Sequence, residues 1–260
     1  MAMNREQKTQ RAADFWRTNS YEIKEFAIKD GKKHPFAVIC PGGGYWMVCS
    51  FVEGIPFAKK LNEMGYSAFV VYYRVKKKAK FPAPQEDLAR AIEEILARAE
   101  EWNLDTEGYS VWGSSAGGHL AASFGTESMG YEKYGLPKPG ALVLTYPVVT
   151  MGPLTHGGSR RNLLGRYPSE DMIYLTSVEK QVTANYPPTF LWCGDEDQTV
   201  DPQNSHLLEA ALKAADVPCR FLEYAGVDHG VGLGEGLVCE GWIDEAVRFW
   251  ELQREKLFTE

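Results

Sequence analysis

The segment Gly113–Gly118, with the sequence GSSAGG, places Ser115 at the centre of a Gly-x-Ser-x-Gly pattern. It follows an apolar, strand-like run and precedes a helical pattern of small residues. In this strand–turn–helix context the pattern is typical of a nucleophilic serine on a tight, strained turn, where glycines let strand and helix approach closely. The start of the helix favours the negative charge that develops during acyl transfer. We therefore expect Ser115 to be a nucleophile.

A second glycine motif, Gly42–Gly44, directly follows Pro41 and another apolar run. Acyl transfer needs preorganised N–H donors aimed at the developing oxyanion, and a glycine run exposes such groups to a substrate. A phosphate-binding loop is not favoured, because the motif lacks a following Gly-Lys-Ser/Thr and the chain lacks Gly-x-Gly-x-x-Gly. We expect the N–H groups of Gly43, Gly44 and Ala116 to form an oxyanion hole.

A nucleophilic serine needs a general base, and the base needs an acid that orients it. Of the five histidines, only His229 follows the last predicted strand. The loop after the preceding strand offers four carboxylates, and its Gly-x-x-Asp-x-x-Val spacing favours Asp197, with Asp195 as the alternative. The chain order Ser115, Asp197, His229 is the order expected for a serine on such a turn.

The elements that must position these residues alternate along the chain. Continuous apolar runs predict strands buried on both faces, and apolar stripes such as Leu88–Trp102 predict helices packed on them. This alternation predicts an α/β fold with a mostly parallel sheet of about eight strands and helices on both faces. Ligands bind beyond the carboxyl ends of such strands, where the motifs lie. The predicted strands are 36–40, 67–73, 109–112, 141–146, 189–193 and 220–224; the other predicted helices are 54–64, 117–127, 202–215 and 240–255.

Two segments do not follow the alternation. Residues 1–20 predict a short helix before the sheet begins near Tyr21, and residues 147–186 hold only short helical pieces between two strands. We expect this insertion to lie near the active site and the whole chain, 1–260, to form one domain with a minimal cap. The lysine-rich run 76–80 is interpreted as a solvated loop.

Composition excludes several classes of function. The 260 residues carry 35 acidic side chains against 28 Lys and Arg, a net charge of −7, which disfavours a nucleic-acid binder. No run is long and apolar enough to cross a membrane, and the polar start of the chain is unlike a secretory signal. The five cysteines are widely spaced, without a zinc or disulfide pattern. We expect a cytoplasmic protein with reduced thiols and with neither a metal nor an organic cofactor.

Taken together, these motifs resemble those of the α/β-hydrolase superfamily, over nearly the whole chain. Within it, the sequence is similar to bacterial acetylxylan and sugar-acetyl esterases. Pro41 stands where lipase-like esterases carry a histidine, which separates the chain from lipases. The matching segments are PGGGY at 41–45, YYR at 72–74, GSSAGGHLAA at 113–122, YPV at 146–148, GSRRNLLG at 158–165, the stretch 187–200 and DHG at 228–230.

The resemblance implies the α/β-hydrolase fold and a serine carboxylesterase that hydrolyses short-chain acetyl esters, with O-acetylated sugars or xylo-oligosaccharides as substrates. A small-molecule ester is then the binding partner. The candidate substrate-binding residues are Tyr45, Trp46, His156, Arg161 and Asn162.

Two alternatives remain open, and a third, a cysteine hydrolase, is disfavoured because residue 115 is a serine. A serine exopeptidase would share the fold and the three catalytic residue types, although such enzymes carry an additional propeller or cap. Carboxymethylenebutenolidase-like hydrolases carry cysteine in place of the nucleophilic serine. A non-catalytic binding protein on this fold would typically lack one member of the triad. A homo-oligomer is also possible, because Trp242 and Trp250 on the last predicted helix could belong to an interface or to the core.

Overall fold

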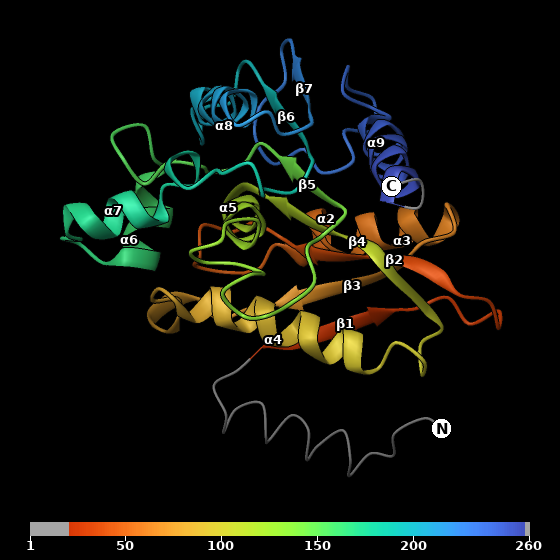
Figure 1. Ribbon diagram of the computed structural model, residues 1–260. Helices are drawn as coiled ribbons and strands as arrows, with labels where there is room; N and C mark the ends of the chain where they lie inside the picture. Colours follow the sequence, from red (N-terminus) through yellow and green to blue (C-terminus); the bar gives the residue numbers. More distant parts are fainter. Residues whose placement is uncertain (1–20, 258–260) are drawn as a thin grey trace.

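The computed structural model describes residues 21–257, which contain one seven-stranded sheet in the order β1-β3-β2-β4-β5-β6-β7 (Figure 1). The edge strand β1 runs antiparallel to β3, and every other neighbouring pair is parallel. The mostly parallel α/β fold is thus confirmed, with one strand fewer in the described part of the chain than the expected eight or so. The strands are β1 (Glu22–Phe26), β2 (His34–Cys40), β3 (Ser67–Tyr72), β4 (Leu104–Ser114), β5 (Ala141–Thr145), β6 (Thr189–Gly194) and β7 (Cys219–Tyr224).

Strand β1 has no predicted range, and among the six strands that have one, β4 differs most from its prediction. It begins at Leu104, five residues before the apolar run that predicts it. Its polar first half pairs with the start of β2, from His34 opposite Leu104, and the register shifts between Pro35 and Ala37. Because this half is partly exposed, its sequence lacks the continuous apolarity by which the buried half is recognised.

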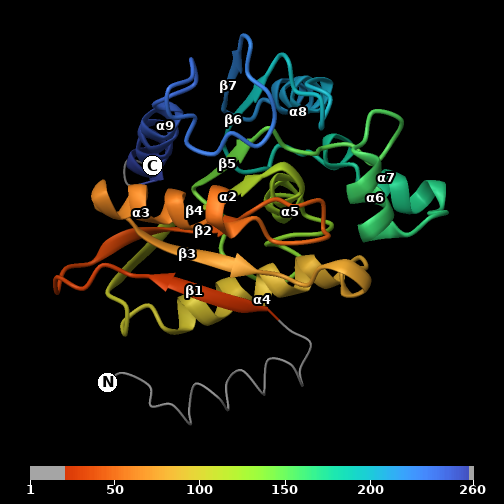
Figure 2. The ribbon, with the colours of Figure 1, turned by 180° about the vertical axis from the view of Figure 1, so that it is seen from behind.

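Helices cover both faces of the sheet, as Figures 1 and 2 show from opposite sides. Helices α4, α5 and α8 pack on one face, and α3 and α9 pack on the other. This arrangement buries β5 and β6 completely, which explains why their residues are continuously apolar. The helices are α2 (Ser50–Glu53), α3 (Ile55–Glu63), α4 (Ala83–Ala97), α5 (Ser115–Phe124), α8 (Gln203–Ala214) and α9 (Trp242–Leu257).

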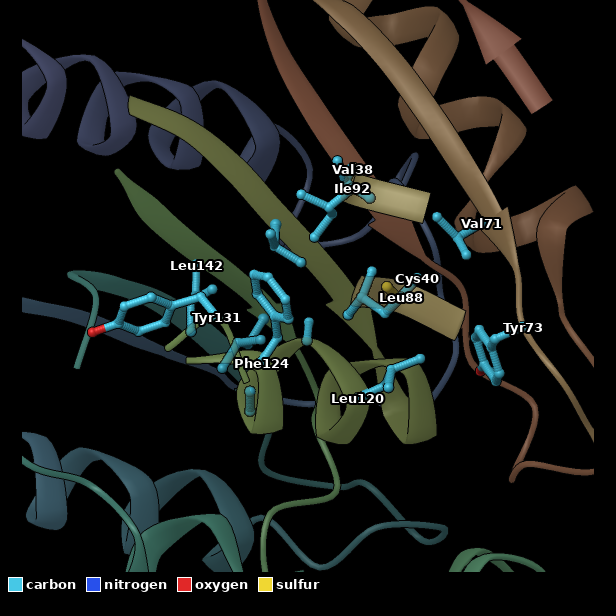
Figure 3. Close-up of a cluster of buried hydrophobic side chains, with 14 of the residues drawn as sticks. Val38, Cys40, Val71, Tyr73, Leu88, Ile92, Leu120, Phe124, Tyr131 and Leu142 are labelled. Atoms are coloured by element: carbon cyan, nitrogen blue, oxygen red, sulfur yellow. The ribbon is translucent and has the colours of Figure 1, made fainter. Parts of the chain in front are cut away.

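The larger core lies between the sheet and helices α4 and α5. Figure 3 shows Leu88 and Ile92 of α4 facing Leu120 and Phe124 of α5, with strand residues such as Val38 beside them. These five side chains have at most 2% of their surface exposed. The apolar stripe that predicts α4 extends beyond it, because the helix ends at residue 97 and the chain continues in turns.

The second core lies between the sheet and helices α3 and α9. Trp242 and Trp250 of α9 are buried there, with 1% and 0% of their surface exposed. The ring of Trp242 lies 5.2 Å from that of Phe57 and 5.6 Å from that of Trp192. Both tryptophans of the last helix therefore belong to the core, which removes the sequence-based reason for expecting an interface on it.

The insertion between β5 and β6 contains short helical pieces, as predicted. They are α6 (Gly157–Leu164), α7 (Glu170–Thr176) and the 3-10 turn η2 (Val178–Lys180). Figure 1 shows α6 and α7 side by side at one end of the sheet. The lysine-rich run forms an exposed 3-10 turn, η1 (Lys76–Lys78), consistent with a solvated loop. The helix predicted for residues 1–20 lies outside the described residues.

Three further observations concern residues 21–257 as a whole. None of their helices is long and apolar enough to span a lipid bilayer. All five cysteines are free thiols, three of them buried. No group of three or more His, Cys, Asp or Glu side chains gathers in this part of the chain as ligands of a metal ion would.

Candidate active site

Ser115 lies at the junction of β4 and α5 with a backbone φ of +54°. This left-handed conformation is costly for a residue with a side chain and is found mostly where structure around it enforces it. A Cβ atom on Gly113 would lie 2.2 Å from the carbonyl oxygen of Gly117, and a Cβ on Gly117 would lie 2.0 Å from that of Cys40. The two glycines of the motif are therefore required for the turn to close.

The side chains of Ser115, His229 and Asp197 form one continuous chain of hydrogen bonds. The Oγ of Ser115 lies 2.9 Å from Nε2 of His229, and Nδ1 of His229 lies 2.6 Å from Oδ2 of Asp197. A carboxylate can only accept, so Nδ1 carries the proton and Nε2 of the neutral ring accepts from the serine hydroxyl. This is the geometry of a nucleophile, a general base and an orienting acid.

The loop after β6 determines which carboxylate meets the histidine. Asp197 is 6% exposed, and its Oδ1 accepts the N–H groups of Thr199 and Val200, each at 2.8 Å. These bonds aim the other oxygen at the imidazole. Asp195 instead accepts the N–H of Gly226 at 2.7 Å and joins the loops after β6 and β7. The structure thus places Asp197, and not the alternative Asp195, beside the histidine.

The glycine loop after β2 lies directly against the serine. A Cβ on Gly42 would approach the Cβ of Ser115 to 2.7 Å. Gly43 and Gly44 have φ values of +120° and +64°, and within residues 21–257 their N–H groups meet no acceptor. Ala116 is the second residue of α5, where a helix leaves N–H groups without an intrahelical partner. These three donors are free to bind an oxyanion next to Ser115.

Three side chains hold the glycine loop in place. Tyr73 donates from its hydroxyl to the carbonyl of Pro41 at 2.6 Å, and Asn162 of α6 donates to the carbonyl of Gly44 at 2.8 Å. The hydroxyl of Tyr45 lies 2.8 Å from Nδ1 of a histidine inside α5. The loop is therefore fixed from the sheet, from the insertion and from α5, the helix that begins at Ser115.

That histidine, His119, is fully buried. Its Nε2 lies 2.8 Å from the carbonyl oxygen of Thr176, which can only accept, so Nε2 carries the proton and Nδ1 accepts from Tyr45. Burial lowers the pKa of His119 to about 4. It is a neutral structural group that joins the glycine loop to α5 and to the insertion, in line with the sequence-based expectation that only His229 serves as the base.

A cavity of about 440 Å³ opens above the serine. Its lining combines Gly43 and Gly44 of the glycine loop, apolar side chains from the segment 46–52, and polar groups from the insertion. This volume lies within the range usual for small-molecule sites. The lining residues are Gly43, Gly44, Trp46, Met47, Cys49, Val52, Glu53, Ser115, His156, Gly158, Asn162, Thr199, His229 and Gly230.

Three of the five candidate substrate-binding residues line this cavity, namely Trp46, His156 and Asn162. Tyr45 requires a correction, because its side chain is fully buried and its hydroxyl is occupied inside the protein. Its φ of +56° accompanies this inward direction. Arg161 lies on α6 with an exposed side chain and is not part of the cavity wall.

The neutral form of His156 has a fixed tautomer. Its Nδ1 accepts the N–H of Ser159 at 3.3 Å as the cap of α6, so the ring proton is on Nε2. Burial and the positive charge that His229 can carry lower the pKa of His156. No acceptor among the described residues meets Nε2, so this N–H is available to a molecule in the cavity.

Sequence reasoning assigned no role in the site to Glu53, Tyr146, Met47 or Val52. Glu53 and the two apolar residues line the cavity, and the ring of Tyr146 packs against that of His229 with 4.7 Å between centroids. A carboxyl on the helix that follows the glycine loop is the one local signal that could have pointed to Glu53. Its neighbours in space are far from it in sequence, so the pattern alone does not reveal its contacts.

Comparison with known proteins agrees with the fold. The model of the BD-FAE family matches residues 26–212, most of the chain. The chain belongs to the BD-FAE family. The crystal structure of an acetyl ester-xyloside bifunctional hydrolase from Caldicellulosiruptor lactoaceticus superposes with a TM-score of 0.81 at 32% identity, covering 89% of this chain and 87% of that one. The carboxylesterase Cest-2923 from Lactobacillus plantarum, at 22% identity and a TM-score of 0.78, shares the fold over 90% of this chain and 93% of its own.

Two curated relatives are longer than this BD-FAE chain. Endo-1,4-beta-xylanase B from Butyrivibrio fibrisolvens is 32% identical over 248 residues, which are 88% of this chain and 39% of the relative. An acetylxylan esterase from Xylanibacter ruminicola is 31% identical over 199 residues, 75% of this chain and 40% of the relative. The chain thus matches about two fifths of the length of each. The fold of the chain is that of the α/β hydrolases.

Proposed function

We propose that this chain is a serine carboxylesterase that removes short acyl groups, acetyl above all, from O-acylated sugars. The observation that carries the proposal is the hydrogen-bonded series Ser115 Oγ, His229 Nε2, His229 Nδ1 and Asp197 Oδ2, at 2.9 and 2.6 Å. Unpaired N–H donors lie beside the serine, and relatives named as esterases support the same class.

Acylation follows from this geometry. The Oγ of Ser115 attacks the ester carbonyl carbon while Nε2 of His229 takes the hydroxyl proton. Asp197 holds the imidazole in the required tautomer and stabilises its protonated form. The negative charge that forms on the carbonyl oxygen is bound by the N–H groups of Gly43, Gly44 and Ala116. When the carbon–oxygen bond to the alcohol breaks, His229 returns the proton to the leaving oxygen.

Deacylation repeats these steps with water. His229 removes a proton from a water molecule as the water oxygen attacks the acyl carbon, and the same three N–H groups bind the second oxyanion. The ester bond to Ser115 then breaks, the serine oxygen regains its proton from His229, and the carboxylic acid leaves. Every group that the two half-reactions need belongs to this chain.

The cavity wall supports a short acyl group on a polar alcohol. Trp46, Met47 and Val52 provide an apolar surface, while His156 offers an Nε2–H donor and Asn162 is fixed through Gly44. A hydroxylated alcohol such as a sugar could use the polar groups. The relatives whose names contain xyloside or acetylxylan act on compounds of this chemical type.

The test compares wild type with Ser115→Ala on p-nitrophenyl acetate, butyrate and octanoate, and on acetylated xylo-oligosaccharides. We expect wild type to prefer the acetate ester, to release acetate from the oligosaccharide and to lose both activities in the variant. Cleavage of nitrophenyl acetate without release of acetate from the sugar would remove the substrate assignment alone. Hydrolysis of an aminoacyl-p-nitroanilide in place of the esters would support an exopeptidase.

A matched pair of variants tests the polar wall. His156→Ala removes a donor that lines the cavity, whereas His206→Ala removes a histidine that is hydrogen-bonded to Glu223 and is not part of the cavity wall. We expect His156→Ala to raise KM for the acetylated sugar while nitrophenyl acetate hydrolysis stays close to wild type. Equal effects on both substrates would mean that His156 maintains the geometry of the site and does not bind the sugar.

A further inference from the structure

Glu53 places a carboxyl group at the wall of the active-site cavity. It is the last residue of α2, and only 4% of its surface is exposed, at the cavity wall. No lysine or arginine among the described residues lies within 4 Å of this carboxyl. Burying an acidic group without a cation is costly unless hydrogen bonds compensate, so its contacts indicate what it does.

One carboxyl oxygen holds the glycine loop. Oε2 of Glu53 accepts the N–H of Gly42 at 2.7 Å. A Cβ on Gly42 would touch both this oxygen and the Cβ of Ser115, each at 2.7 Å, so this backbone lies between the carboxyl and the nucleophile. The bond therefore sets how closely the oxyanion donors at positions 43 and 44 approach the serine.

The other oxygen is linked to the histidine loop through Tyr146. Oε1 of Glu53 accepts from the hydroxyl of Tyr146 at 3.0 Å, and that hydroxyl accepts the N–H of Gly232 at 3.3 Å. Gly232 is three residues after His229, whose ring packs edge-on against the ring of Tyr146. One carboxyl group thus connects the loop that carries the oxyanion donors with the loop that carries the base.

We propose that Glu53 is a positioning residue for the esterase reaction. It holds the glycine loop against Ser115 through Gly42, and it stabilises the protonated imidazole of His229 through its charge and through Tyr146. This inference rests on the proposed serine esterase mechanism. Glu53 acts through neighbouring groups and takes no part in bond making.

The contacts of the carboxyl suit its ionised form, because both oxygens face donors. Burial raises the pKa of Glu53, while the Gly42 N–H, the Tyr146 hydroxyl and the charge of His229 act in the opposite direction. Several other titratable groups surround Glu53 and His229, and they can also contribute to the pH profile of the reaction. Those facing Glu53 are Cys49, Tyr73, Tyr146 and His229, and those facing His229 also include His156, Asp197 and Asp228.

The test uses two substitutions with different chemistry. Glu53→Gln keeps the shape and can still accept from Gly42, but it removes the negative charge. Glu53→Asp keeps the charge and shortens the side chain. Glu179→Gln is the matched control, since Glu179 is a half-buried glutamate of η2 that is not part of the cavity wall. Each variant is assayed on p-nitrophenyl acetate from pH 5 to 9, with its fold checked by circular dichroism.

We expect Glu53→Gln to lower kcat about tenfold, less than the loss of a whole oxyanion donor, with KM within about twofold. The acid limb of its kcat/KM profile moves to lower pH, because removing a facing negative charge destabilises the imidazolium. Glu53→Asp lowers kcat but keeps the acid limb at the wild-type pH. Glu179→Gln changes neither.

Two outcomes would overturn the proposal. In one, Glu53→Gln keeps the wild-type kcat and pH profile; in the other, both Glu53 variants lose activity equally with an unmoved acid limb, as a packing defect would give. If Glu53→Gln does not fold, Tyr146→Phe decides, since a wild-type kcat there contradicts the link. An active wild type that Ser115→Ala inactivates keeps the proposed function intact in either case, whereas an inactive wild type would refute that function itself.

Discussion

The buried histidine of α5 makes the stability of this protein depend on pH in a way that can be calculated. Burial lowers the pKa of His119 from 6.5 to about 4 in the folded protein, whereas the unfolded chain keeps the ordinary value. Between these two values the unfolded state binds more protons, so the free energy of unfolding falls as pH falls from about 6.5 to about 4. Each pKa unit corresponds to about 1.4 kcal/mol, so the loss amounts to roughly 3 kcal/mol.

The perturbation that isolates this effect is His119→Gln. Glutamine can donate to the Thr176 carbonyl but does not titrate. The variant therefore lacks the fall in the free energy of unfolding that protonation of His119 causes in wild type. Other buried groups also titrate in this range, among them Glu53 and Asp87, whose pKa values burial raises. These contributions are common to both proteins and cancel in the difference between wild type and variant.

The assay is urea unfolding of both proteins at pH 7, 6, 5 and 4, followed by tryptophan fluorescence. We expect the variant to be less stable at pH 7, because its side chain replaces the imidazole imperfectly between Tyr45 and Thr176. The difference in the free energy of unfolding between wild type and the variant should become smaller by roughly 3 kcal/mol on going from pH 7 to pH 4. Parallel stability curves from pH 7 to pH 4 would refute the reasoning and would mean that His119 is already accessible to protons in the folded protein.

Four further variants test other parts of the site. Asp197→Asn should lower kcat by about 10³–10⁴-fold, because the amide no longer holds the required imidazole tautomer. Asp195→Asn, the control, should keep most of the activity. Similar losses in both variants would reject Asp197 as the orienting acid. Gly42→Ala adds a Cβ 2.7 Å from the Cβ of Ser115. We therefore expect kcat to fall at least about tenfold and Tm to fall as well. A wild-type kcat and Tm would contradict the close contact between the glycine loop and Ser115. Asn162→Ala removes the hydrogen bond from the Asn162 amide to the carbonyl oxygen of Gly44. We expect kcat to fall by about twofold to tenfold in steady-state kinetics. An unchanged kcat would show that the glycine loop is held without this hydrogen bond.

The sequence predicted the fold, and it singled out the three side chains that the structure brings together, because their signals are local. Strand β6 is an almost continuous apolar run. The glycines around Ser115 directly indicate a tight turn, whose backbone at Ser115 has a positive φ. Asp197 and His229 follow from their positions after consecutive strands of a parallel sheet, whose carboxyl ends meet at one edge.

The remainder of the site depends on directions that a linear pattern does not encode. Tyr45 follows three glycines, yet its left-handed backbone turns the side chain inward to a histidine 74 positions later. Arg161 and Asn162 are adjacent in sequence, but only Asn162 faces the cavity from α6. Glu53 gains its significance from Gly42 and Tyr146, 11 and 93 positions away.

The measurement closest to the central claim is covalent labelling of the nucleophile. Wild type and Ser115→Ala are treated with a fluorophosphonate, and intact mass and peptide mapping locate the adduct, with nitrophenyl acetate hydrolysis measured in parallel. We expect one adduct per wild-type chain, on Ser115, together with loss of hydrolysis, and neither labelling nor hydrolysis in the variant. A variant that keeps the activity, or an adduct on another residue, would contradict the role of Ser115 and the mechanism built on it.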